Sequence, residues 1–349
     1  MIYYFLIFIY LMFCMTRVVS KYNTLYLELY LLVTLIFLST FRSFGVGADT
    51  LVYLMFFQDF PNLFNFDFDY LAHIEIGFRF FLATIKIFTH SEEFFLFLSS
   101  AFCIIPVYLG LKKLKLEYAL VGLFFYFLIF FINYPNSVIR QGISMGLFVL
   151  SLPYMRDRQH FMVLLLGAIS SLFHTTGFII FLCYIFTFFE YKKALTITLL
   201  FSFVSFFLYK FNVLQYLIFN YIGSGYEEVY TVQFSEDTSL SQYLYRVAVA
   251  FLIGFLIFRV DNDFYKKLFL FYLMGFFVYI ALSDNNLLAA RFNMFFRMLE
   301  LVLIPYALTC IRDYRYRLFF FIVFFSVFLL FFIKSVNIPY NQYRFSDFI

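Results

Sequence analysis

The chain has 349 residues, of which 64% are hydrophobic, 26% aromatic and only 13% charged, and its net charge is +4. Because a soluble domain carries about 25% charged residues, this composition excludes an ordinary water-soluble globule and indicates a chain surrounded by lipid. The net charge is small and the basic residues are scattered along the chain, which excludes a nucleic-acid-binding arm. We therefore expect an all-α polytopic integral membrane protein, with a single transmembrane domain over residues 1–349.

Apolar runs bounded by charged residues predict about twelve transmembrane helices. The first run lacks the basic start and the cleavage site of a signal peptide, so we expect it to be retained. One further segment, 71–90, carries Glu75, Arg79 and Lys86 and is expected to be a helix in the outer membrane interface. The predicted spans are 2–16, 22–41, 93–111, 117–133, 138–155, 160–173, 176–189, 194–210, 244–258, 268–283, 291–309 and 318–334.

Short basic connections between the predicted spans indicate how the chain is oriented in the membrane. Six of them hold 15 of the 25 Lys and Arg residues and alternate correctly if all are cytoplasmic and both termini lie outside. The outer side then has two long loops, 42–70 and 211–243, and three short turns at 133–137, 174–176 and 283–290. The six connections are 17–21, 112–117, 156–158, 190–193, 259–267 and 312–317.

The basic residues left for the outer side or the membrane are mostly arginines, seven of ten. Arginine keeps its charge and grips phosphate oxygens through two parallel hydrogen bonds, so these residues favour a lipid-linked phosphate or diphosphate as the ligand. The alternative is that each arginine anchors a helix end at the lipid headgroups.

The starts of two predicted spans show this excess of arginine most clearly. Arg140 follows the helix-breaking run 133–137 and opens a span, where its guanidinium and the backbone amides could converge on one anion. Arg291 and Arg297 open another span, although Glu300 stands one turn after Arg297 and the two could simply neutralise each other.

Residues that could remove a proton are few on the outer side. His174 lies in the polar turn SSLFHTTG and could act as a base near neutral pH, or it could cap a helix end. Asp49 could cap the following helix or orient an arginine or a sugar hydroxyl. The D-x-D patterns at 67–69 and 261–263 are weak signals, and the sequence has no Walker A, H-E-x-x-H or G-x-S-x-G motif.

Five motifs occur in a characteristic order: FRSFGVGADTLVY, EIGF, NSVIRQGISMGLFVLS, SLFHTTGFIIFLCY and RFNMFFRMLELVLIPY. In order and spacing they resemble the EpsG/Wzy-type polysaccharide polymerases of bacteria, and the resemblance covers most of the chain. Ala48 replaces the threonine-like residue that usually precedes the loop aspartate, while Asp49 is kept.

The resemblance implies a glycosyltransferase with a GT-C-like helix bundle in the bacterial inner membrane and an active site facing the periplasm. It would build O-antigen, lipopolysaccharide or capsule chains by moving a growing glycan from undecaprenyl diphosphate to a hydroxyl of an incoming lipid-linked unit. Because diphosphate is a good leaving group, neither a metal nor another cofactor is expected. Besides the bilayer and the undecaprenyl-diphosphate-linked oligosaccharide, the implied partners are a chain-length regulator and a flippase.

The same resemblance implies roles for seven residues. Arg140, Arg291 and Arg42 would contact the diphosphate, with Arg297 as a further candidate, and His174 would be the base for the acceptor hydroxyl. Glu75 and Asp49 would be the alternative bases to His174, or they would accept hydrogen bonds from sugar hydroxyls.

Other readings stay open at this point. A flippase or transporter of the same lipid-linked oligosaccharide would also use cations among about twelve helices, although the two halves of the sequence show no clear repeat. Another lipid-linked-sugar glycosyltransferase or ligase would use Asp67 and Asp69 with a divalent metal. A membrane acyltransferase would need a histidine on the inner side. Loop 211–243 could stack Tyr221, Tyr226 and Tyr230 on sugar rings or act as a lid.

Overall fold

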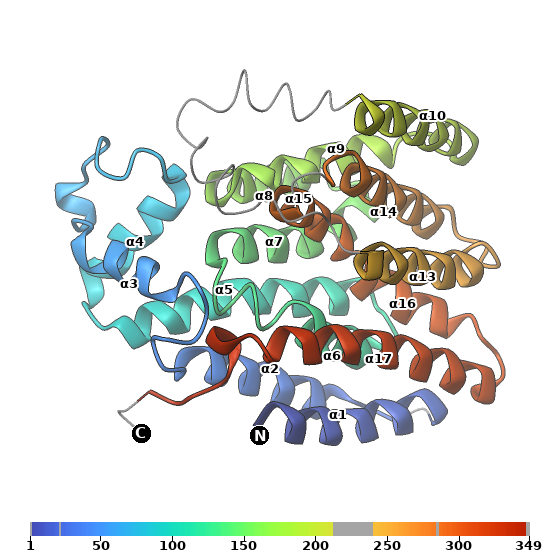
Figure 1. The fold of residues 1–349 in the computed structure, drawn as a ribbon, viewed down its shortest axis with the longest axis horizontal. Helices are drawn as coiled ribbons and strands as arrows, with labels where there is room; N and C mark the ends of the chain where they lie inside the picture. Colours follow the sequence, from blue (N-terminus) through green and yellow to red (C-terminus); the bar gives the residue numbers. More distant parts are fainter. Residues whose placement is uncertain (1, 21, 212–239, 284–285, 347–349) are drawn as a thin grey trace. The chain divides into compact units, whose positions relative to one another are not determined.

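The computed structural model describes residues 2–20, 22–211, 240–283 and 286–346 (Figure 1). Loop 211–243, with its three tyrosines, lies almost wholly outside these residues. Within them the chain is helical and has no β-strand, only an isolated antiparallel bridge between Arg42 and Phe345. The expectation of an all-α polytopic membrane protein is confirmed.

Seven helical segments of the described chain are long and apolar enough to cross a membrane. Six are single helices, and the seventh is formed by two consecutive helices, α15 and α16. They are α1 (Ile2–Val19), α5 (Glu92–Lys113), α10 (Tyr191–Lys210), α13 (Leu240–Ile257), α14 (Asp263–Ala281), α15 (Asn286–Arg297) with α16 (Glu300–Thr309), and α17 (Tyr314–Val336).

The remaining described helices are shorter or less apolar. They are α2 (Leu25–Thr40), α3 (Thr50–Asp59), η1 (Leu63–Asn65), α4 (Ile76–Phe88), α6 (Ala119–Ile129), α7 (Ile139–Arg156), α8 (His160–Phe173), η2 (Thr175–Phe178), α9 (Ile179–Phe186) and η4 (Pro339–Asn341). Each predicted span falls on helical structure, but the span 291–309 is interrupted between Arg297 and Glu300. The expected helix at 71–90 is α4, and its 13 residues are too few for a full crossing, which takes about 20.

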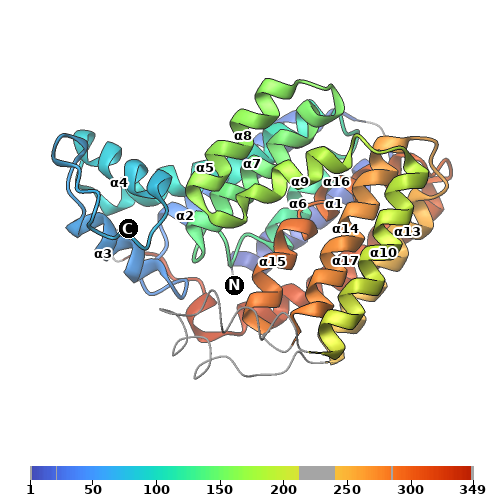
Figure 2. The same ribbon diagram turned by 90° about the horizontal axis from the view of Figure 1, so that it is seen from above.

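The chain forms two compact units. Unit 1 consists of Met1–Phe181 and Leu308–Ile349, and unit 2 consists of Leu182–Ala307. In unit 1, α5 packs between α2 and α7, α7 packs on α8 (Figure 1 and Figure 2), and α1, α6 and α17 contact one another. The α5–α7 contact is close because a glycine faces the partner backbone: a Cβ on Gly110 would lie 2.5 Å from the Val149 carbonyl oxygen. In unit 2, α14 packs against α10, α13 and α15.

One end of unit 1 gathers connections that the sequence assigns to the cytoplasm. Arg17 lies 3.8 Å from the Glu117 carboxylate, and Arg156 donates to the Leu114 carbonyl at 3.0 Å. Three of the predicted cytoplasmic connections therefore meet at one end of the unit, as the orientation requires.

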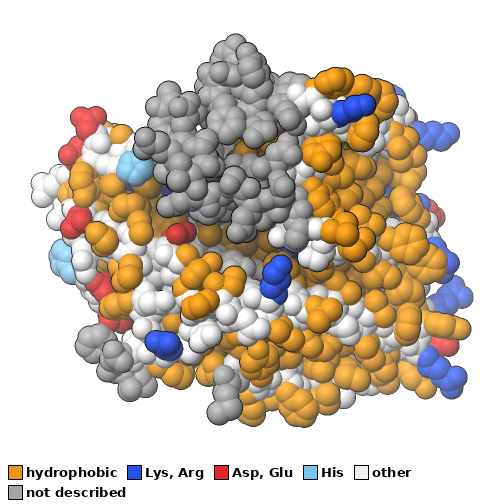
Figure 3. All heavy atoms as spheres, in the orientation of Figure 1, with side chains coloured by type: hydrophobic (Ala, Val, Ile, Leu, Met, Phe, Trp, Pro, Cys, Tyr) orange, Lys and Arg blue, Asp and Glu red, His pale blue; other side chains and the backbone are white. Residues whose placement is uncertain are grey.

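The helices of unit 1 present apolar side chains outward. On α1 the side chain of Phe5 is 64% exposed, and on α17 that of Leu330 is 70% exposed. Figure 3 shows hydrophobic side chains over much of the visible face along α1 and α17. Such surfaces are expected of helices that face lipid.

Candidate active site

An ion pair lies where α4 and α7 begin in unit 1. Arg140, in the first turn of α7, pairs with the carboxylate of Glu75, the residue just before α4. The other Glu75 oxygen accepts from the Thr175 amide at 3.2 Å, and Arg140 Nε donates to the Tyr53 hydroxyl at 3.4 Å. The side chains of Arg140 and Glu75 are 23% and 15% exposed, so the pair is partly accessible.

Arg140 can bind an anion while it is paired with Glu75. The two contacts of Arg140 use two of the five N–H donors of a guanidinium, and the others remain for a ligand. No side chain caps the N-terminus of α7, whose first-turn amides carry the positive end of the helix dipole. Burial raises the pKa of Tyr53, so its hydroxyl stays protonated beneath the guanidinium.

Arg42 has a different environment, because it is completely buried. Its guanidinium donates to the carbonyl oxygens of Ser39, Val46 and Asn136 and to the Thr50 hydroxyl, the last three at 3.3 to 3.4 Å. Burial lowers the pKa of Arg42 to about 10. In this structure Arg42 therefore ties the 42–50 loop to the 133–137 turn and has no surface exposed to a diphosphate.

Gly47 allows the close approach of these two segments. Its φ angle of +92° is in a region that side chains rarely adopt, and a Cβ there would lie 1.8 Å from the Asn136 carbonyl oxygen. Asp49 follows at the N-cap of α3, but its side chain makes no capping hydrogen bond. Instead its amide donates to the Ser137 hydroxyl at 3.3 Å, which joins the loop to the segment that leads into Arg140.

His174 ends α8 and begins η2. Its Nδ1 lies 3.3 Å from the Thr176 amide and 2.6 Å from the Thr176 hydroxyl. Because a backbone N–H can only donate, Nδ1 is the acceptor and the proton of a neutral ring resides on Nε2. His174 thus caps η2, and its neighbour Thr175 provides the amide that binds Glu75.

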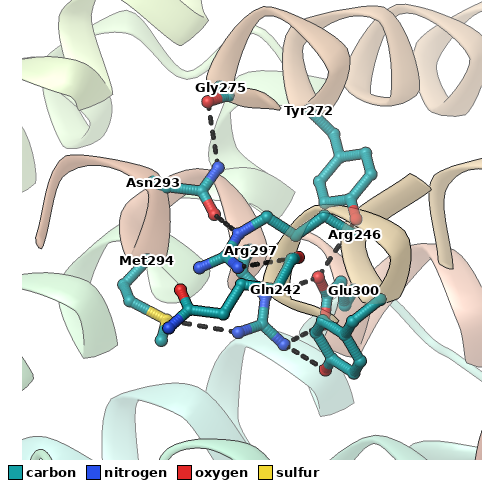
Figure 4. Close-up of polar contacts among 9 residues, drawn as sticks. Gln242, Arg246, Tyr272, Gly275, Asn293, Met294, Arg297 and Glu300 are labelled. Atoms are coloured by element: carbon teal, nitrogen blue, oxygen red, sulfur yellow. Dashed lines mark hydrogen bonds and ion pairs between the residues drawn. The ribbon is translucent and has the colours of Figure 1, made fainter. Parts of the chain in front are cut away.

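Unit 2 contains a second polar cluster (Figure 4). Arg297 and Glu300 are almost completely buried and lie 2.8 Å apart across the break between α15 and α16. Arg297 also donates to the Tyr245 hydroxyl at 2.5 Å, and the Tyr272 hydroxyl donates to Glu300 at 3.1 Å. The mutual neutralisation that the sequence left open is present, so the charge of Arg297 is balanced inside the unit. Arg291 lies further back along α15 and is half-buried.

Arg246, the other arginine of this cluster, has no role predicted from the sequence. It is 5% exposed, donates to Asn293 Oδ1 at 3.0 Å and lies 3.7 Å from the centre of the Tyr279 ring. No carboxylate pairs with it within the described residues of unit 2. The available signal was its place inside the apolar run 244–258, since an ionisable residue in a membrane span usually has a function or a buried partner.

The seven predicted residues are thus distributed over both units. Glu75, Arg140 and the His174 turn come together in unit 1, where Asp49 and Arg42 contact the segment that leads into Arg140. Arg291 and Arg297 belong to unit 2. Tyr53 and Asn136, which have no predicted role, complete the first cluster. The described residues include no group of three side chains suited to hold a metal ion.

Comparison with known families gives one match, to the EpsG family, over residues 25–345. Curated proteins and solved structures give no match. The matched residues include both polar clusters and every described helix after α1. Since the match extends over nearly the whole sequence, the chain belongs to the EpsG family.

Proposed function

We propose that this protein is a polysaccharide polymerase that transfers a growing glycan from undecaprenyl diphosphate to a hydroxyl of an incoming lipid-linked repeat unit. Membership of the EpsG family supports a polymerase-type function in general, and the apolar helices indicate a multi-pass membrane protein. The active site would face the periplasm of a bacterial inner membrane, where O-antigen or capsule units are joined, beside a flippase and a chain-length regulator.

The observation that carries the proposal is the Arg140–Glu75 pair at the uncapped start of α7. Transfer breaks the bond between the sugar and the diphosphate, so negative charge develops on the leaving oxygen. A guanidinium and helix N-terminal amides held in place before the reaction stabilise such charge. No metal or nucleotide is needed for this step.

We assign the role of general base to Glu75. When the diphosphate binds the remaining donors of Arg140, it shares the positive charge that Glu75 otherwise has to itself, and the Glu75 carboxylate can accept the proton of the acceptor hydroxyl as the new glycosidic bond forms. His174 suits this role less, because its Nδ1 already accepts from Thr176. It would position the turn whose Thr175 amide holds Glu75. Arg140 binds diphosphate, while Arg42 supports the loop beneath it.

A gel ladder of surface polysaccharide tests the function. Cells lacking this chain should make only single-repeat product, and the wild-type chain should restore the ladder. Arg140→Ala and Glu75→Gln should not restore it. Arg344→Ala is the matched control: it removes an exposed arginine side chain but keeps the backbone oxygen that binds Ser43, so its ladder should be normal.

The same experiment can overturn the proposal. Lipid-linked units that accumulate on the cytoplasmic side of the null strain would show a transporter instead. A full ladder from Arg140→Ala, at wild-type protein level, would remove Arg140 from the site.

A further inference from the structure

A second group of cations lies at the other end of unit 1 from Arg140, where α1 ends and α6 and α17 begin. Figure 1 shows the end of α1 and the start of α17 on the same side of the unit. Tyr118 is the residue just before α6. The guanidinium carbons of Arg17 and Arg317 lie 5.2 and 5.7 Å from the centre of its ring. Two guanidinium groups therefore share one aromatic ring.

Their charge is only partly balanced. The carboxylate of Glu117 lies 3.8 Å from Arg17, which also donates to the Glu117 carbonyl at 2.9 Å. Arg317 has no ion pair with any described residue. Both arginines are more than nine-tenths buried, and the Nε atom of each is buried without a hydrogen-bond acceptor in the described chain. Buried cationic donors of this kind are costly unless an anion is near.

The start of α6 adds to the positive potential. No side chain caps this helix, so its first amides present the positive end of the helix dipole beside the two arginines. A helix N-terminus flanked by guanidinium groups is suited to a phosphate.

The surface around the two arginines indicates which phosphate-bearing ligand would bind there. The helices that carry the two arginines expose large apolar side chains along their length, Phe5 and Phe8 on α1 and Phe319 and Leu330 on α17. A ligand with both a phosphate and acyl chains fits a cationic group at the end of such helices. We propose that the cluster of Arg17, Tyr118 and Arg317 binds the headgroup of an anionic phospholipid in the cytoplasmic leaflet.

Native mass spectrometry of the purified full-length chain tests this site with two defined lipids, phosphatidylglycerol and phosphatidylcholine. The wild-type chain should retain phosphatidylglycerol in preference. An arginine beside an anionic membrane surface strengthens binding about fivefold, so Arg317→Gln should lower retention by about that factor, and Arg17→Gln/Arg317→Gln should abolish the preference. Arg312→Gln, which removes an exposed arginine from the same connection, should leave it unchanged.

Equal retention of both lipids by the wild-type chain would overturn the proposal, and this result requires no variant to fold. A preference that survives in a folded double variant would overturn it too. Addition of inorganic phosphate distinguishes the source: millimolar phosphate that displaces the lipid completely would indicate a soluble phosphate ligand and exclude the lipid site. The measurement does not depend on polymerase activity, so it is separate from the function proposed above.

Discussion

Three arginines of this chain have three different electrostatic environments. Arg140 is partly exposed and pairs with Glu75, Arg42 is fully buried among carbonyl and hydroxyl oxygens, and Arg297 is fully buried against a carboxylate. A guanidinium whose donors are all taken by the protein holds segments together, whereas one that keeps spare donors can bind a ligand. The environment of each arginine therefore predicts what its replacement will do.

Replacing Arg42 by lysine should lower both stability and activity, whereas replacing Arg140 by lysine should lower activity alone. A lysine ammonium cannot reach the spread-out acceptors of Arg42, so Arg42→Lys should lower the unfolding temperature and shorten the polymer together. Arg140→Lys should shorten the polymer with little change in the unfolding temperature. Thermal unfolding in detergent and the gel ladder measure the two effects. Normal stability of Arg42→Lys with a lost ladder would indicate that Arg42 contacts substrate after all.

Loss of one partner of the Arg297–Glu300 pair should destabilise unit 2. Arg297→Met leaves a buried carboxylate without its cation, and removing one partner of a buried pair costs about 3–5 kcal/mol. Arg297→Met/Glu300→Leu removes both charges and should unfold at a higher temperature than either single variant. The four thermal unfolding curves form a double-mutant cycle. Additive effects would contradict a direct pair.

Gly47 and Gly45 provide a matched comparison within one loop. Gly47→Ala combines a positive φ with a clash against the Asn136 carbonyl, whereas a Cβ on Gly45 meets no atom within 4 Å. We expect Gly47→Ala to lose about 1–3 kcal/mol of stability, the usual cost of a strained backbone residue, and to weaken the polysaccharide ladder. Gly45→Ala should change neither. Equal effects of the two substitutions on thermal unfolding would contradict the close packing on Asn136.

At the scale of elements, the residues after α17 fasten the outer loop. Ser43 and Gly47 donate their amides to the carbonyls of Arg344 and Tyr340 at 2.8 and 2.7 Å, and Ser346 donates to Phe41 at 3.1 Å. The loop that carries Arg42 and Asp49 is thus held by a segment about 300 positions away in the sequence. Its conformation depends on this contact as well as on its own residues.

Deletion of residues 339–349 should therefore loosen the loop without removing a helix that crosses the membrane. Hydrogen exchange at Ser43 and Gly47 should become faster, and the ladder should shorten. The exchange of α5 and α7 should stay as in the full chain, which serves as the internal control. Unchanged exchange at the two loop amides would show that the contact does not hold the loop.

The sequence predicted the elements better than the contacts between them. Apolar runs mark the helices, because a lipid-facing helix must be apolar along its length. The break between Arg297 and Glu300 leaves no such mark, since the apolar pattern continues through it. The burial of Arg42 was equally hidden, because one of its acceptors is the backbone carbonyl of Asn136, 94 positions away. A carbonyl oxygen is part of every residue and gives no sequence signal.

At the scale of the whole molecule, the direction of the chain across the membrane decides which substrates the Arg140–Glu75 pair can meet. The connections between the helices of unit 1 lie at two ends. The basic connections meet around Arg17 and Arg156, and the connections rich in turns meet around Arg140. The positive-inside rule assigns the basic end to the cytoplasm. We therefore predict that the Arg140–Glu75 pair lies on the periplasmic side.

Thiol labelling in spheroplasts tests this orientation with a cysteine that the chain already has. Cys310 is exposed and lies beside the basic connection 312–317, while Cys14, Cys103 and Cys183 are buried. A membrane-impermeant reagent should label Cys310 only after the membrane is permeabilised. In a Cys310→Ser background, Asp69→Cys, at an exposed position between η1 and α4, should be labelled in intact spheroplasts. The reverse pattern would place Arg140 and Glu75 on the cytoplasmic side, where a periplasmic polymerase could not use them.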